Sequence, residues 1–433
     1  MIEREREEFG RRHARSRELH ERAARSLLAG VPMSWMTMWA GAHPIYLDTA
    51  EGARLVDVDG NEYADFCLGD TGAMAGHSPE PVMRAIRERA GLTTMLPTED
   101  AAWVGEELTR RFGLPYWQFS LTATDANRWL LRMCRQVTRR PKVAVFNWCY
   151  HGSVDEAFVT TDGSREGNVG PMVDPVETTR VAEFNEVDSV EAALAHGDVA
   201  CLLMEPALTN IGIVLPEPGF LEAVRELCTR HGTLLIVDET HTFSAGPGGC
   251  TAAWELEPDA VTLGKSIGGG VPIGAYGVTA ELAERIAAQE DADYEDTGGV
   301  GGTLAGNALS LAAARATLGE VLTDQAFARM TSLCERFVAG VEEALSRWSV
   351  PWSVVRLGAR AEYRLAPQPP RTGAESAAAT DREVEEYLHL YLLNRGVLIT
   401  PFHNMALMCP ATTPAQVDRH SDVFGAALEE LYG

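Results

Sequence analysis

The stretch DAVTLGKSIGGGVPIGAYGV, residues 259–278, holds two short apolar runs separated by a glycine-rich turn. The runs AVTL and AYGV carry no charge, which is typical of strands buried on both faces of a sheet. Lys265 stands just after the first run. Because glycine lets the backbone approach a ligand closely, a lysine entering such a turn at a strand end indicates a candidate site.

The sequence before this stretch repeats the pattern of a short apolar run followed by a helical segment. This alternation predicts a mainly parallel sheet with crossover helices, and therefore an α/β fold. The predicted strands are residues 142–146, 200–204, 234–237, 260–263 and 275–278, and the predicted helices include 124–139 and 217–231.

The two ends of the chain follow a different pattern. Residues 52–66, GARLVDVDGNEYADF, alternate like an antiparallel hairpin with an Asp-Gly turn, and beyond about residue 330 helices mix with isolated strands such as GVLIT at 396–400. We expect both ends to build one smaller α+β domain. The predicted domains are 1–75, an N-terminal helix and the first segment of the smaller domain; 76–325, the large α/β domain; and 326–433, the rest of the smaller domain.

Composition limits the function classes. With 45% hydrophobic and 23% charged residues, the 433-residue chain reads as an ordinary soluble globular protein. The net charge of −25 argues against binding to nucleic acid or an anionic membrane. Eight cysteines without a CxxC pair indicate no zinc site and no disulfide framework. The N-terminus is dense in both charge signs, with no signal peptide and no apolar run of roughly 18 residues. We therefore expect a cytoplasmic protein without a metal site.

Lys265 is unusual for this chain, because only two of the 37 basic residues are lysines, the other being Lys142. Arginine stays protonated in proteins, whereas lysine can lose its proton and act as an amine nucleophile. From composition alone, amine chemistry and an ordinary surface charge are equally open.

A second candidate group follows the predicted strand 234–237, in LLIVDETHTF. Asp238 and Glu239 stand where open α/β sheets bind ligands, and an acid there could pair with a cationic ring nitrogen or a metal, or simply cap a helix. Together with Lys265 at the same sheet edge, Asp238 supplies the two parts that pyridoxal phosphate (PLP) needs. The lysine forms the Schiff base, and the acid keeps the pyridine nitrogen protonated.

PLP also requires a phosphate cradle and a stacking ring. In FSLTATDANRWLLR, residues 119–132, small and hydroxyl residues precede an amphipathic helix, an arrangement suited to binding phosphate at the helix N-terminus. Thr124 and Asp125 are predicted to cap that helix, and a plain cap without ligand stays open. NWCYHG, residues 147–152, offers Tyr150 and His151 at the same edge, either as a ring partner or as a packed loop aromatic.

These motifs, with MEPALTNIG and GGTLAGNALSLAAA, occur in an order that resembles the class III aminotransferases of PLP fold type I. Within them, the chain is similar to the branch that includes glutamate semialdehyde aminomutase. The resemblance implies PLP as cofactor and assigns catalytic roles to Lys265, Asp238 and Tyr150. Its implied cofactor contacts are Lys265 as Schiff-base lysine, Asp238 on the ring nitrogen, Thr240 behind the ring, Tyr150 in front, His241 near the ring hydroxyl, Glu205 beside Asp238 or that hydroxyl, and Ala123 and Thr124 on the phosphate.

The resemblance also implies a homodimer, because Thr303 in GGTLAGN would reach the phosphate bound by the neighbouring subunit. One departure concerns the phosphate motif, which usually reads Ser-Gly-Thr and here reads TAT at 122–124. Ala123 thus stands where glycine lets the backbone approach, and phosphate binding should survive if its φ is negative.

The other departures concern the substrate. The aminomutase arginine for the substrate carboxylate is missing from GVPMSWMTMWAG, residues 30–41, and an expected acid is replaced in TPFHNMALMCP, residues 400–410. A wall of Met and Trp suits a bulky apolar group, although such residues can equally be core. Arg356, Arg360 and Arg364 alternate as if on one strand face, which could bind a carboxylate or form a solvated stripe. The substrate-binding candidates are Trp35, Met36, Trp39, Arg360 and Asn404.

The resulting prediction is a homodimeric PLP-dependent aminotransferase. It would move an amino group between a bulky apolar or aromatic amine or amino acid, β-amino acids included, and a keto acid or aldehyde. The alternative is an aminomutase of the glutamate semialdehyde type, against which the missing arginine and acid weigh. A non-catalytic fold type I protein is a third reading, disfavoured by the presence of Lys265 with Asp238.

Overall fold

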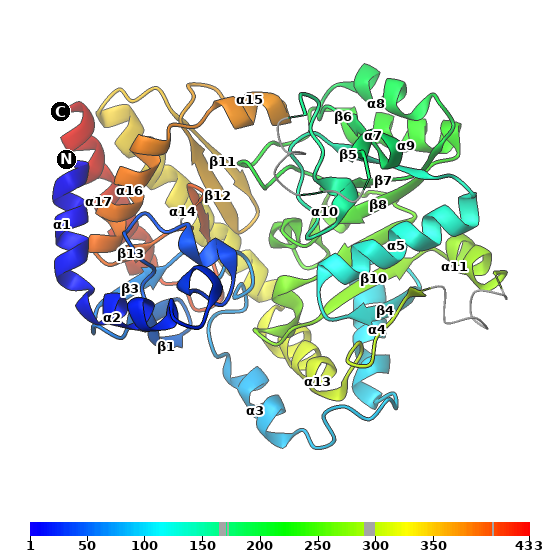
Figure 1. Cartoon of the computed structure of the whole chain (residues 1–433), viewed down its shortest axis with the longest axis horizontal. Helices are drawn as coiled ribbons and strands as arrows, with labels where there is room; N and C mark the ends of the chain where they lie inside the picture. The colour runs from blue at the N-terminus through cyan, green and yellow to red at the C-terminus, as the bar shows by residue number, and fades with distance from the viewer. Residues whose placement is uncertain (164–169, 171–172, 290–298, 401) are drawn as a thin grey trace. The chain divides into compact units, whose positions relative to one another are not determined.

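The computed structural model describes residues 1–163, 170, 173–289, 299–400 and 402–433 (Figure 1). The chain divides into two compact units. The first contains Met1–Pro79, Gln325–Pro369 and Ala379–Gly433, and the second contains Glu80–Asp324 and Pro370–Ala378. Both ends of the chain therefore belong to the first unit.

A seven-stranded sheet forms the centre of the second unit among the described residues. Its order in space is β4 (Tyr116–Ser120), β10 (Gly274–Val278), β9 (Ala260–Leu263), β8 (Leu234–Asp238), β7 (Val199–Met204), β5 (Lys142–Phe146) and β6 (Thr179–Ala182). Neighbours from β9 to β6 pair in parallel, whereas β10 runs antiparallel to both β9 and β4. The predicted mainly parallel α/β fold is confirmed.

The central strands are apolar because helices cover the sheet. Every residue of β7, β8, β9 and β10 is buried, and helix α5 packs on β7, β9 and β10 and crosses the sheet in Figure 1. The helices of this unit are α3 (Glu80–Glu88), α4 (Glu99–Phe112), α5 (Ala123–Thr138), α7 (Pro175–Thr178), α8 (Val187–Leu194), α9 (Phe220–His231), α10 (Gly249–Ala253), α11 (Ala280–Ala287), α13 (Ala308–Ala316) and α15 (Gly373–Ala378).

The described residues of the first unit form two small sheets and five longer helices. One sheet has the order β1 (Leu47–Glu51), β2 (Arg54–Asp57), β3 (Glu62–Asp65) and β13 (Val397–Leu398), and the other has the order β11 (Ser353–Leu357), β12 (Arg360–Arg364) and β14 (Met405–Leu407). The helices are α1 (Ile2–Arg12), α2 (Ala14–Ala23), α14 (Asp324–Arg347), α16 (Arg382–Asn394) and α17 (Pro414–Tyr432). Because β13 pairs in parallel with β3, strands from both chain ends share a sheet.

Two local expectations were wrong. Residues 366–381, whose many proline and small residues are typical of a mobile or partner-ordered loop, contain helix α15. Gly373 N donates to Glu183 Oε1 at 2.8 Å, and Ser376 Oγ donates to the Ile211 carbonyl at 2.6 Å. Arg356, Arg360 and Arg364 were expected on one strand face. They do not share a strand, since Gly358, with φ of +58°, turns the chain between β11 and β12. Arg356 lies on β11, and the other two are buried on β12.

No described helix has the length and apolar character needed to cross a membrane.

Candidate active site

The candidate residues of the second unit gather where its parallel strands end. Asp238 is the last residue of β8, and Lys265 follows β9 after a single glycine. Tyr150 and His151 lie in the segment after β5, and Glu205 follows β7 directly. Since β5, β7, β8 and β9 run in parallel, these side chains reach the same sheet edge, as expected for an open α/β fold.

Asp238 is held by three donors. Its Oδ2 lies 2.8 Å from His151 Nδ1 and accepts from Asn127 Nδ2 at 2.9 Å, while Oδ1 accepts from Thr240 N at 3.0 Å. Burial by itself would raise the pKa of Asp238. The hydrogen bond and charge of His151, with the hydrogen bonds from Thr240 and Asn127, outweigh burial and hold that pKa well below its ordinary value. Asp238 is therefore a carboxylate throughout the physiological range.

Two of these contacts extend the set of candidate site residues. Asn127 comes from α5 and is fully buried, and it also donates to the His151 carbonyl at 3.1 Å. Its sequence signal was a polar residue on the apolar face of an amphipathic helix. His151 was noticed at the sheet edge but given no role. Burial opposes its protonation, yet its acidic neighbours Cys149 and Asp238 hold the pKa of His151 well above the ordinary value.

Lys265 opens a short 3-10 turn, η5 (Lys265–Gly268), with φ of +47°. Its Nζ contacts His241 Nε2, and His241 Nδ1 lies 2.7 Å from Thr209 Oγ1. Thr209 Oγ1 in turn donates to Glu205 Oε2, and Glu205 Oε1 accepts from Tyr150 N at 3.4 Å. No sequence pattern selects Thr209, because it is an ordinary loop residue until the fold brings it beside His241.

The TAT segment forms the N-terminus of α5. The helix begins at Ala123, and Thr122 is the cap, with its side chain accepting from Asp125 N at 3.2 Å; the predicted cap by Thr124 and Asp125 was wrong. Ala123 does not adopt positive φ, so alanine fits this position without strain. Thr124 Oγ1 instead accepts from Ser153 N at 3.2 Å, beside Gly152, where any Cβ would overlap Thr124.

Gly264 brings the Lys265 turn against this helix end. A Cβ on Gly264 would lie 2.8 Å from Ala123 Cβ and 3.0 Å from Ala123 N. Its φ of −166° is extended, so a substitution would act through this contact rather than through backbone strain.

We expect Gly264→Ala to weaken PLP binding about tenfold and to lower the free energy of unfolding by about 1–3 kcal/mol, because overpacking displaces the start of α5. Cofactor titration followed by visible absorbance, together with denaturant unfolding, measures both. Gly246→Ala is the matched control, since Gly246 has φ of 169° and nothing within 4 Å of an added Cβ. Unchanged affinity in Gly264→Ala would contradict the expected crowding.

The residues at this sheet edge fit PLP. They include a half-buried amine, an ionised carboxylate, an aromatic ring on Tyr150 and a helix N-terminus. Three buried polar atoms here, Thr240 Oγ1, His151 Nε2 and Ser266 Oγ, also have no hydrogen-bond partner within the described part of the chain. Buried polar groups are usually paired, so these atoms mark a site with room for a polar ligand.

The remaining candidates lie elsewhere in the chain. Thr303 belongs to the second unit and is exposed. The five substrate-binding candidates, Trp35, Met36, Trp39, Arg360 and Asn404, all belong to the first unit, and their roles toward a substrate stay predictions.

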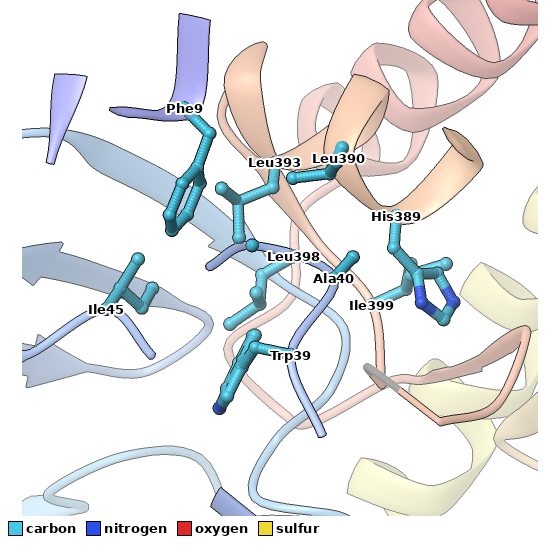
Figure 2. Close-up of a pocket in the computed structure, with 10 residues that line it drawn as sticks. Phe9, Trp39, Ala40, Ile45, His389, Leu390, Leu393, Leu398 and Ile399 are labelled. Atoms are coloured by element: carbon cyan, nitrogen blue, oxygen red, sulfur yellow. The ribbon is translucent and has the colours of Figure 1, made fainter. Parts of the chain in front are cut away.

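Within the first unit, the candidates Trp35, Met36 and Trp39 have different surroundings. Figure 2 shows Trp39 among Phe9, Ile45 and Leu398, where the enclosed cavity is about 10 Å³, roughly the room for one water. Met36 is 40% exposed, and Trp35 packs edge-on against Phe402 with ring centroids 5.7 Å apart. Trp39 is therefore a packing residue of this unit.

Arg360 and Asn404 are buried polar residues of the first unit. Arg360 Nη2 lies 3.5 Å from Asp70 Oδ1, and its Nε and Nη1 have no hydrogen-bond partner among the described residues. Asn404 Nδ2 donates to Glu385 Oε1 at 3.4 Å. The alternative that Arg356, Arg360 and Arg364 form a solvated stripe was wrong, since Arg360 and Arg364 are only 1% and 3% exposed.

The second lysine has an ordinary structural role. Lys142 Nζ donates to the Val176 carbonyl at 2.9 Å and lies 3.8 Å from Asp198 Oδ2. It stands at the start of β5, at the opposite end of that strand from Tyr150.

A family profile described as "Aminotransferase class-III" matches residues 36–428. The chain belongs to the class III aminotransferases. This class III aminotransferase is therefore a PLP-dependent enzyme, and the predicted family, fold type, cofactor and enzyme class are confirmed.

Relatives of this class III aminotransferase are named either as aminomutases or as transaminases. It is 34% identical over 407 residues to glutamate-1-semialdehyde 2,1-aminomutase 2 of Brevibacillus brevis. The aligned residues cover 90% of this chain and 92% of that protein. It is 49% identical to a glutamate-1-semialdehyde-aminomutase of Pseudomonas aeruginosa PAO1 solved in complex with PMP, with a TM-score of 0.97 over 99% and 97% of the two chains. An omega-transaminase of Sphaerobacter thermophilus is 29% identical, with a TM-score of 0.87 over 96% and 98%.

These relatives correct the main functional prediction. The sequence was interpreted as a transaminase for a bulky apolar or aromatic substrate, but proteins called aminomutases are more similar to the class III aminotransferase than the transaminase is. The prediction gave more weight to residue types at two departures than to the resemblance of the rest of the chain to the aminomutases.

Proposed function

We propose that the enzyme is an aminomutase of the glutamate-1-semialdehyde type, which moves an amino group between neighbouring carbons of one substrate. The observation that carries the proposal is the 49% identity and TM-score of 0.97 to the Pseudomonas aeruginosa aminomutase over 99% of the chain. The lysine and carboxylate at the sheet edge supply the chemistry that such a transfer requires.

Within this proposal, Lys265 binds the cofactor covalently and carries the proton between carbon atoms. Asp238 would hold the ring nitrogen of PLP, and Thr240 and Tyr150 would contact the ring. Ala123 and Thr124, at the α5 N-terminus, would hold the phosphate. PLP, when bound, supplies an electron-withdrawing ring that stabilises negative charge on the substrate carbon.

The surrounding residues keep these groups in the required state. His151 and Asn127 support the proposed role of Asp238, because their hydrogen bonds hold it ionised in a buried position. An ionised acid stabilises a protonated ring nitrogen, which strengthens electron withdrawal. Burial of Asp238, 3% exposed, keeps water from competing for this contact.

We also propose a homodimer, with Thr303 contacting the phosphate bound by the partner subunit. The exposed position of Thr303 supports this, as does the neighbouring Leu304, which is 50% exposed. A cytoplasmic location is supported by the eight cysteines, which are all buried and without disulfides.

The decisive experiment supplies glutamate-1-semialdehyde to the purified enzyme with no added amino acceptor. We expect an isomer of identical mass with the amino group on the neighbouring carbon, detected by chromatography and mass spectrometry. A parallel reaction offers aromatic amines with keto acids. Turnover only in the parallel reaction would contradict the aminomutase proposal.

A further inference from the structure

We propose that Glu205, Thr209 and His241 form a proton relay that takes a proton from the amine of Lys265 before it binds the cofactor. The relay, defined as these three residues, starts at the contact of Lys265 Nζ with His241 Nε2. It continues from His241 Nδ1 to Thr209 Oγ1 at 2.7 Å, and ends where that hydroxyl donates to Glu205 Oε2. The four side chains thus form one unbroken line of hydrogen bonds.

The end of the relay fixes its direction. An ionised Glu205 can only accept, so Thr209 donates to it and must itself accept from His241 Nδ1–H. His241 Nε2 then carries a lone pair that faces the Lys265 amine. In this arrangement the imidazole is a base for the lysine, oriented by a hydroxyl and a carboxylate behind it.

Transfer of one proton reverses every hydrogen bond in the relay. A proton leaves the Lys265 ammonium for His241 Nε2, the Nδ1 proton passes to Thr209, and the hydroxyl proton passes to Glu205. The lysine becomes a neutral amine and Glu205 a neutral acid, with no change in total charge and no redox step. A neutral amine is the form of lysine that would bond to the aldehyde carbon of PLP.

Glu205 is suited to receive this proton. It is 3% exposed, and burial raises its pKa above the ordinary value, although the charge of His151 and the hydrogen bond from Thr209 oppose that rise. A buried carboxyl with a raised pKa accepts a proton more readily than a surface acid.

The other ionisable groups around the relay are already engaged. Asp238 and His151 pair with each other at 2.8 Å. Glu239 is bonded outside the relay, because its carboxylate accepts from Thr251 N and Oγ1 and from Cys250 N. Glu205 Oε1 accepts from the Tyr150 backbone N, so its second oxygen is left for Thr209.

The test measures the rate of covalent capture of PLP by the full-length enzyme at neutral pH, after cofactor removal. Borohydride reduction fixes the adduct, and peptide mass spectrometry locates it. Thr209→Val removes the hydroxyl, Thr209→Ser keeps it, and Glu205→Gln removes the final acceptor. Thr233→Val is the matched control, because this buried threonine precedes β8 at the opposite sheet edge and its hydroxyl donates to the Val199 carbonyl at 3.3 Å.

We expect the rate of capture at neutral pH to fall about tenfold in Thr209→Val and Glu205→Gln, because the amine can then give up its proton only to solvent. Thr209→Ser and Thr233→Val should match the unmodified enzyme. An unchanged rate in both Thr209→Val and Glu205→Gln would overturn the relay. An equal loss in Thr209→Ser would also overturn it, because the effect would then come from the lost methyl group.

This inference rests on the proposal that Lys265 is the cofactor lysine, and the two can fail separately. An adduct on Lys142 would refute the cofactor lysine. An adduct on Lys265 with unchanged capture rates would refute the relay alone. Neither result depends on the identity of the amine substrate, because capture is measured without substrate.

Discussion

Lys265→Ala is expected to lose turnover by about 10³-fold or more while the fold is kept. Removing the amine removes both the covalent attachment of the cofactor and the group proposed to move the proton between carbons. The fold should tolerate the change, because lysine and alanine both carry a Cβ and meet the same strain at φ of +47°.

Turnover of glutamate-1-semialdehyde, borohydride trapping of PLP and thermal unfolding give the three readouts for Lys265→Ala. Lys142→Ala is the control, since its side chain contacts Val176 and Asp198 at the start of β5. It should keep turnover and trapping. Undiminished turnover in Lys265→Ala would refute the catalytic assignment.

Asp238→Asn should reduce turnover by about 10²- to 10⁴-fold, because an amide of the same shape cannot stabilise a protonated ring nitrogen. The carboxylate also pairs with His151, so the variant removes the partner that keeps the imidazole charged. Single-turnover kinetics should place the loss in proton abstraction rather than in substrate binding. Normal rates would show that the ring nitrogen is stabilised by another group.

The same variant has a pH signature in stability. The folded pKa of Asp238 lies below its unfolded value near 3.8, so its stabilising contribution is present above that pH and is lost as the pH falls through the folded value. The folded pKa of His151 is raised above 6.5, so its contribution is present below 6.5 and is lost as the pH rises through the folded value. Denaturant unfolding of Asp238→Asn should therefore show its largest deficit between about pH 4 and 6.5.

Asp259→Asn provides the control for Asp238→Asn. Asp259 precedes β9 at the opposite sheet edge, where its carboxylate accepts from Leu235 N at 2.7 Å and Arg225 Nη1 at 2.9 Å. The variant should keep turnover, even if local stability falls.

The strands were predictable because burial on both faces leaves a clear signal. KVAVF and AVTL are strands at the predicted residues, Lys142–Phe146 and Ala260–Leu263. Helix α15 was missed because it is short and follows a Pro-rich segment, and its bonds to Glu183 and Ile211 have no local signature.

The site was predictable only as far as strand ends and motifs allow. Asp238 and Lys265 follow strands of a parallel sheet, so their shared edge could be inferred. The contact between His241 and Thr209 joins segments 32 residues apart, and no periodic pattern announces it. The side-chain environments of Trp39 and Arg360 were equally hidden, because residue type does not reveal whether a position is core, surface or site.

Because the Lys142 ammonium is bonded to the Val176 carbonyl and lies near Asp198, it affects how the enzyme can be immobilised. Amine-directed coupling to a solid support would have only the chain terminus, Lys142 and Lys265 to react with, and reaction at Lys265 would occupy the group assigned to the cofactor. Lys142 is a poor substitute because its side chain is only 18% exposed. The 62 carboxylates are far more numerous, so carbodiimide coupling or an anion-exchange matrix is the gentler route to an immobilised catalyst.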